Sequence, residues 1–233
     1  LARLDEPRLL LGVAIACVFA VLFGALPKLR ADDGDAQEDE SLLWRLTRSA
    51  GVFVPLLFTV PLAARTDLGS TFAATAVQLV LLCVAACVIG LRHRATVLPT
   101  GAALISAVAL FTRSLTHPPE TAVAVWQPLG LALGLLVVFA AFAEISRRLD
   151  PSRRELAAAA TALALTLLSL APLAAPFAEA AGPWPWLLLW AVAGIGMARF
   201  ATLLALPQLQ LASTGLLAVG LGAALAALAG QDG

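Results

Sequence analysis

Long apolar stretches alternate with short polar ones along the whole chain, and this alternation predicts the architecture. The clearest example is the segment 126–154, in which no charged residue lies from 128 to 143. An uncharged run of this length crosses most of a bilayer as a helix. A block of basic residues, which stays on the cytoplasmic side of a membrane, ends it: Arg147, Arg148, Arg153 and Arg154.

Counted outward from this segment, the apolar runs predict about eight transmembrane helices, with seven as the alternative count. In chain order the expected ranges are 9–26, 49–64, 70–91, 95–112, the segment just described, 154–171, 186–204 and 209–228. The connections between them are short, and no stretch is long enough for a separate soluble domain. We therefore expect one all-α polytopic membrane bundle over residues 1–233.

The composition agrees with a membrane protein. Hydrophobic residues make up 61% of the chain and charged residues only 13%, and the mean hydropathy is +0.92. Soluble domains carry about a quarter charged residues, so this chain has too little charge to cover a water-facing surface. The formal net charge is zero, which gives no long-range field for nucleic acid. The expected partners are the bilayer and other membrane subunits.

The one long polar stretch is an acidic loop at 28–44. Its centre, residues 31–40, holds six carboxylates and no apolar residue larger than alanine. Such a run is typical of a solvated, mobile tether, and binding of a cation or a partner is the alternative. Residues 41–48, with Trp44 followed by Arg45 and Arg48, have the pattern of a short amphipathic piece at the membrane interface.

Prolines interrupt three of the expected helices. Pro55 and Pro61 fall within 49–64, Pro99 falls near the start of 95–112, and Pro172 follows 154–171. Proline removes a backbone donor and tends to kink a helix. Membrane transporters often use broken helices at their binding sites, so these positions favour a transporter as one reading.

The chain offers little for catalysis. It contains two histidines and no tyrosine, and it has none of the common nucleotide-binding or hydrolase motifs. Cys83 and Cys87 share one helical face, where two small buried side chains are a simpler reading than a metal pair. We therefore assign no catalytic residue, no cofactor and no metal ligand.

Two ionisable residues fall inside expected spans. Glu144 precedes Arg147 and Arg148 by three and four residues, which fits either a proton or cation site or a local salt bridge. Arg199 lies two-thirds along the span 186–204. It is placed to bind an anionic substrate or a lipid phosphate, to extend to the cytoplasmic surface, or to pair with Glu144.

One uncharged polar residue also stands out within a span. Gln78 shares a helical face with Thr71 and Thr75, at spacings of three and four. We expect this face to contact another helix rather than lipid.

Small residues recur at a spacing of four, which lets helix backbones approach closely in lipid. The positions are Gly130 and Gly134, Gly194 and Ala198, Gly220 with Ala224, and Gly222 with Ala226. They predict tight helix packing, within the chain or against a partner.

Tryptophans cluster around the start of the span 186–204. We interpret Trp184, Trp186 and Trp190 as the aromatic belt of one membrane face.

Three functions fit these features. The first is a non-catalytic integral membrane subunit of a larger complex, with a scaffold, anchor or assembly role. The second is a small-solute transporter or channel that uses the proline-broken helices with Glu144 and Arg199. The third is a lipid-binding or lipid-acting membrane protein.

Short basic hinges such as LRHRATVLP are similar in pattern to those of bacterial multi-span proteins, which implies the plasma membrane.

The basic residues also predict the orientation. Of the 15, 11 fall in one set of alternate loops, and the other set holds only Arg3, Arg8, Arg65 and Arg113. Because basic loops stay in the cytoplasm, both termini are expected on the non-cytoplasmic side and the acidic loop inside.

Cysteine labelling tests this topology. In a variant without native cysteines, a cysteine at Gly233 should react with an impermeant maleimide on intact cells, because the carboxyl terminus is expected outside. A cysteine at Gly34 should react only after permeabilisation. Labelling of Gly34 on intact cells would contradict the orientation.

Overall fold

The computed structural model describes residues 42–64, 72–93, 95–117, 122–149 and 153–204, together with single positions within 12–18 and 210–229. Over these residues the chain forms helices and no strand. The elements are α2 (Leu42–Ala63), α3 (Phe72–His93), α4 (Val97–Thr116), α5 (Ala122–Leu149), α6 (Arg153–Leu168), the 3-10 turn η2 (Ala171–Leu173), α7 (Ala174–Ala181) and α8 (Pro183–Leu204).

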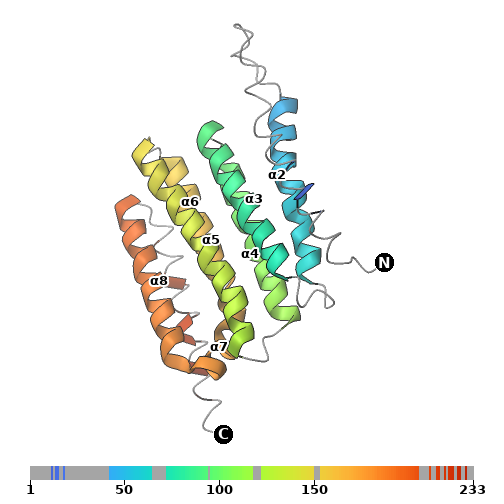
Figure 1. The fold of residues 1–233 in the computed structure, drawn as a ribbon. Coiled ribbons are helices and arrows are strands. Elements are labelled where there is room, and N and C mark those ends of the chain that lie inside the picture. Colours follow the sequence, from blue (N-terminus) through green and yellow to red (C-terminus); the bar gives the residue numbers. More distant parts are fainter. Residues whose placement is uncertain are drawn as a thin grey trace.

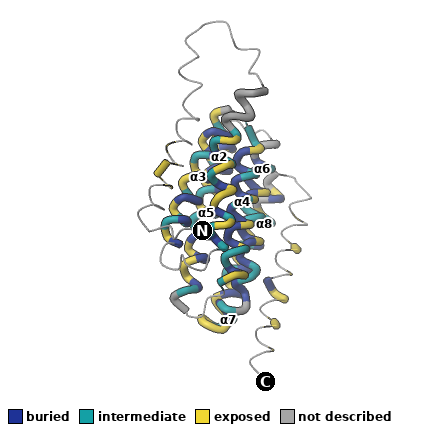
Figure 2. The backbone as a smooth tube through the Cα atoms, turned by 90° about the vertical axis from the view of Figure 1, so that its right-hand side faces the viewer, coloured by how far each residue is buried: buried dark blue, intermediate teal, exposed yellow. Residues whose placement is uncertain are grey.

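The long helices lie side by side, and the short α7 crosses one end of the bundle (Figure 1). Helix α4 is central, because it packs against α2, α3, α5 and α6. Helix α8 packs on α6 and α7. Exposed positions follow the outer helix faces and buried positions the inner ones (Figure 2).

Four helical segments of the described residues are long and apolar enough to cross a bilayer. They are Phe72–Arg92, Val97–Thr116, Ala124–Leu149 and Leu156–Leu173, and a shorter apolar helix runs over Ser49–Ala63. Their outward side chains are also apolar, as with Val77, Leu81 and Val88 on α3. A helix with apolar residues all round suits lipid and not water. The fold is thus a helical membrane bundle.

The helices predicted at 70–91 and 95–112 are confirmed within a few residues as α3 and α4. The expected spans 9–26 and 209–228 lie outside the continuous described ranges, as does the centre of the acidic loop. The single positions described in those two spans are helical.

Helix α2 begins earlier than expected. Residues 42–48 are not a separate interfacial piece, because they continue directly into the helix that ends at Ala63. No glycine or proline separates the two parts, so nothing interrupts the backbone hydrogen bonds there. The helix runs through Pro55 and Pro61, which lie inside it as predicted.

Helix α6 matches the span predicted at 154–171 within a few residues, and its end shows how a proline shortens it. The expected helix ran to 171, but α6 ends at Leu168 because Pro172 has no N–H to donate to the carbonyl of that residue. Bonds of the 3-10 type close the end, with Leu170 N–H donating to Leu167 O at 3.0 Å and Leu173 N–H to Leu170 O at 2.9 Å.

Helix α7, which the sequence reading treated as a loop, follows this turn. Pro176 falls in its first turn, where a backbone N–H has no helical partner to lose. Gly182 then takes a positive φ of 80° and ends the helix, and Pro183 opens α8.

Small side chains let the central helices approach closely. Ala102 and Ala103 on α4, and Ala159, Ala160 and Ala162 on α6, have no exposed surface. Alanine brings two helix backbones near each other without a loss of rotamer freedom. A polar contact between Cys83 Sγ and Ser106 Oγ at 3.1 Å also links α3 to α4.

The connection from α3 to α4 depends on a glycine. A Cβ at Gly90 would lie 2.9 Å from Cδ of Pro99 and 3.2 Å from the carbonyl oxygen of Ala95. Both neighbours are rigid, since one is a proline ring and the other is backbone. The Ala95 N–H also donates to Gly90 O at 3.0 Å, so the turn has little room to relax.

We therefore predict that Gly90→Ala destabilises the bundle by about 1–3 kcal/mol, the usual cost of overpacking. This is expected even though alanine favours a helix over glycine by about 1 kcal/mol. Thermal unfolding in mild detergent measures the change. Gly196→Ala on α8 is the matched control, because a Cβ there meets nothing within 4 Å. Equal melting points for the two variants would show that the turn tolerates a side chain.

Candidate functional site

Glu144 forms a local ion-pair cluster at the C-terminal end of α5. Arg147 donates from Nε to Oε2 at 2.9 Å and from Nη2 to Oε1 at 2.8 Å, and Arg148 donates from Nε to Oε1 at 2.7 Å. The side chains of Glu144, Arg147 and Arg148 are 43%, 58% and 74% exposed. Both carboxylate oxygens are thus occupied at a helix end, where basic residues also complement the helix dipole. This geometry supports the local salt bridge over a proton or cation site.

Arg199 does not join this cluster. Arg199 is exposed on α8, and Glu144 pairs on its own helix instead. Arg153 and Arg154 begin α6, but their side chains fall outside the described set.

Gln78 is buried on α3 together with Thr75, with 4% and 2% exposed surface. Both side chains therefore face the bundle. Thr71, the third member of the predicted polar face, is not among the described residues.

The small residues fall in two kinds of surroundings. Gly194 is buried and Ala198 half-buried on α8, and a side chain at Gly220 would overlap the Trp190 ring. By contrast, a Cβ at Gly130, Gly134 or Gly222 would meet nothing within 4 Å. Within the described chain, then, no helix covers the Gly130–Gly134 face of α5.

The predicted aromatic belt divides between two faces of α8. Trp184 is 78% exposed, whereas Trp186 and Trp190 are 0% and 4% exposed. Residues two apart on a helix lie about 200° apart around its axis, and residues four apart share a face. Trp186 and Trp190 are therefore core residues, and only Trp184 fits the belt interpretation.

These two tryptophans belong to an aromatic cluster that joins three helices. The ring centroids are 5.6 Å apart for Trp126 and Phe177, 5.5 Å for Phe177 and Trp186, and 5.5 Å for Trp186 and Trp190. These contacts fix α7 between α5 and α8. Among the described residues, the buried indole N–H groups of Trp186 and Trp190 meet no hydrogen-bond acceptor.

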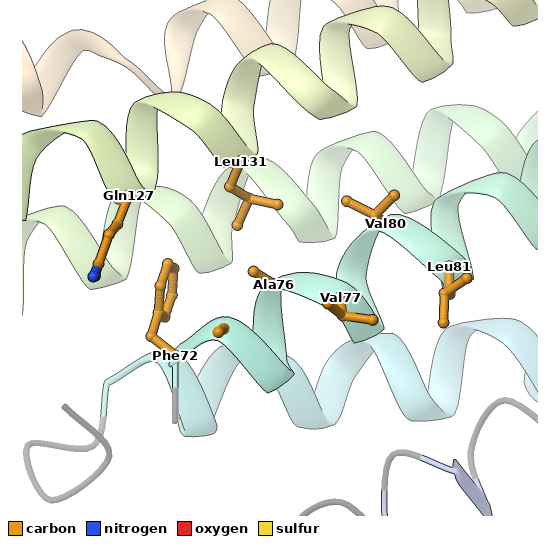
Figure 3. A pocket seen from close by; sticks show the side chains of 8 residues that line it. Phe72, Ala76, Val77, Val80, Leu81, Gln127 and Leu131 are labelled. Carbon is orange, nitrogen blue, oxygen red and sulfur yellow. The ribbon is translucent and has the colours of Figure 1, made fainter. Parts of the chain in front are cut away.

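A groove between α3 and α5 was missed by the sequence reading. Its volume is about 520 Å³, and α3 and α5 supply its wall (Figure 3). The lining residues are Phe72, Ala73, Ala76, Val77, Val80, Leu81, Gln127 and Leu131. The small side chains of Ala73 and Ala76 leave room for the groove. Two alanines three residues apart are the feature of the sequence that could have indicated it.

Arg113 stands beside this groove. Its Cζ lies 4.9 Å from the centroid of the Phe72 ring, in a cation–π contact between α4 and α3. Gln127 is the polar residue of the lining, and Arg113 contacts the lining through the Phe72 ring.

Among the described residues, no group of three or more histidine, cysteine, aspartate or glutamate side chains is placed to hold a metal ion. No family model matches the chain, and no curated protein and no solved structure is significantly similar to it. The functional argument therefore stands on the geometry alone.

We predict that Glu144→Gln leaves the thermal stability of the bundle in detergent unchanged within error. The carboxylate is exposed, and exposed ion pairs on a helix contribute little to stability. Arg148→Gln, which removes one partner of the same cluster, is the matched control and should behave alike. A marked loss of stability in either variant would mean that the cluster supports the fold.

Proposed function

We propose that this chain is a non-catalytic integral membrane subunit of a larger membrane complex, with a scaffold, anchor or assembly role. The observation that carries the proposal is the open Gly130–Gly134 face of α5. In lipid, such small-xxx-small faces associate with another helix through close backbone packing.

The surroundings of Gly130 support a helix-binding seam. Gly130, Leu133, Val137 and Ala140 are all exposed and follow one another at spacings of three and four. In this seam the small residues Gly130 and Ala140 flank the two larger side chains, so ridges of a partner helix fit against the small positions.

The exposed face of α8 offers a contrast. It carries large side chains at Trp184, Leu188, Val192 and Ile195, and its exposed small residues are Ala191 and Gly196. These two lie five residues apart, which is not the spacing of four that brings two helix backbones close in lipid. This difference favours α5 as the interface.

We further propose eight spans, with both termini on the non-cytoplasmic side of a bacterial plasma membrane. The alternating helix directions support this orientation. The basic C-terminal ends of α3 and α5, with Arg92, Arg147 and Arg148, lie at one end of the bundle, and the C-terminal end of α4 with Arg113 lies at the other (Figure 1). Clustered basic residues favour the cytoplasmic side.

A small-solute transporter is the second candidate function. The helix interruption between α6 and α7 favours a transporter, because interrupted helices often line transport sites. Buried polar groups lie next to that break, since the Ser169 hydroxyl donates to Thr166 O at 2.6 Å. The paired state of Glu144 and the continuous course of α2 weigh against it.

Replacing Gly130 with leucine tests the subunit role. The added side chain has room in the monomer but would block close approach of a partner helix. We expect Gly130→Leu, and likewise Gly134→Leu, to reduce co-purifying subunits in mild detergent by about tenfold, because overpacking costs about 1–3 kcal/mol. The melting point of the isolated chain should stay the same. Subunit composition is read by native mass spectrometry.

Gly196→Leu is the matched control, since Gly196 is also exposed with open space around it but lies on α8. It should leave the composition unchanged. A wild-type chain that purifies alone from native membranes would refute the subunit role.

A further inference from the structure

The groove between α3 and α5 has the size of a ligand site. Its volume of about 520 Å³ lies inside the range of roughly 300–1,000 Å³ found for small-molecule pockets. It opens on the outer side of two candidate membrane spans, Phe72–Arg92 and Ala124–Leu149. Whatever occupies it therefore reaches it from the bilayer.

The groove has the depth of a single leaflet. Its lining on α3 runs from Phe72 to Leu81, which is about 13 Å along a helix at 1.5 Å per residue. Half of a bilayer core of about 30 Å is close to this length. Phe72 begins its membrane span, so one end of the groove lies at the interface and the other near the midplane.

The polar groups gather at the interfacial end. Gln127 and Phe72 lie at one end of the groove and Leu81 at the other (Figure 3). The Arg113 guanidinium lies 4.9 Å from the Phe72 ring centroid, close to the end of its own span. The exposed indole of Trp126, next to Gln127, is a side chain typical of headgroup depth.

This distribution selects the chemistry of the occupant. Ala73, Ala76, Val77, Val80 and Leu131 offer only apolar contact along the groove. A guanidinium is the side chain best suited to a phosphate, because it offers several donors in one plane. The occupant is thus apolar over the depth of one leaflet and anionic at the interface.

We propose that this groove binds a phospholipid of the adjacent leaflet, with one acyl chain between α3 and α5 and its phosphate at Arg113. Gln127 donates from its amide to the same headgroup region. The proposal does not rest on the subunit role, although Leu131 of the groove is adjacent in sequence to Gly130 of the seam.

A photoactivatable phosphatidylglycerol, with the reactive group on the acyl chain, tests the site. The full chain is reconstituted in lipid nanodiscs that contain the probe, and the labelled peptides are mapped by mass spectrometry. We expect labels at residues 72–81 and 127–131. Ala76→Leu fills the groove and should lower labelling there several-fold, whereas Ala191→Leu, at an exposed position of α8, should not.

Arg113→Gln tests the phosphate contact. Because one basic residue near a membrane surface contributes about 1 kcal/mol, we expect about fivefold less phosphatidylglycerol labelling in the groove. Arg92→Gln, at the opposite end of α3, is the matched charge control. A photoactivatable diacylglycerol has no phosphate, so its labelling should not respond to Arg113→Gln.

Several outcomes would overturn the proposal. One is groove labelling that neither Ala76→Leu nor Arg113→Gln changes in folded protein. Another is that photocrosslinkers placed on groove residues capture residues 1–41 or a second copy of the chain instead of lipid. If Ala76→Leu lowers the melting point, Ala73→Leu replaces it, because Ala73 is exposed and lines the same groove.

Discussion

The absence of water in the bilayer core is the constraint on which this structure depends. Every backbone group at that depth needs a partner within the protein, so the chain is helical and each break in a helix must be repaired. The end of α6 shows how. Pro172 removes one donor, and the backbone closes the gap with 3-10 bonds before α7 begins. Such a break is costly in lipid unless it is buried, and Leu170 and Leu173 are indeed buried.

The same constraint decides what holds the helices together. Several buried hydroxyls donate to a carbonyl of their own helix, as Thr59 does to Leu56, Ser114 to Leu110 and Thr166 to Ala162. These groups are satisfied locally and give no attraction between helices. Association then depends on close packing, for which the alanine faces of α4 and α6 and the glycine at the α3–α4 turn are suited.

The hydropathy pattern predicted the features that depend on the lipid environment. It missed those that depend on which helices pack against each other. The spans α3, α4 and α5 follow from uncharged length, and the pair of Glu144 with its arginines follows from helical spacing. The burial of Trp186 and Trp190 does not follow from the sequence, because tryptophan is common both at membrane interfaces and in protein cores. Only the position of α7 against α8 decides between them. The groove was missed for a related reason, since a hollow is a relation between two helices and leaves little trace in either sequence.

Helix α5 carries residues of both the proposed lipid groove and the proposed partner seam. Leu135 and Phe139 face the core, Gln127 and Leu131 border the groove, and Gly130 belongs to the open seam. Gln127 and Gly130 are three residues apart, so they lie on the same side of the helix about one turn from each other. A helix docked on the seam would therefore stand beside the interfacial end of the groove, next to the lipid headgroup. If both proposals hold, the bound lipid forms part of the surface that the partner meets. Assembly would then respond to the phospholipid composition of that leaflet, with no catalytic group required in this chain.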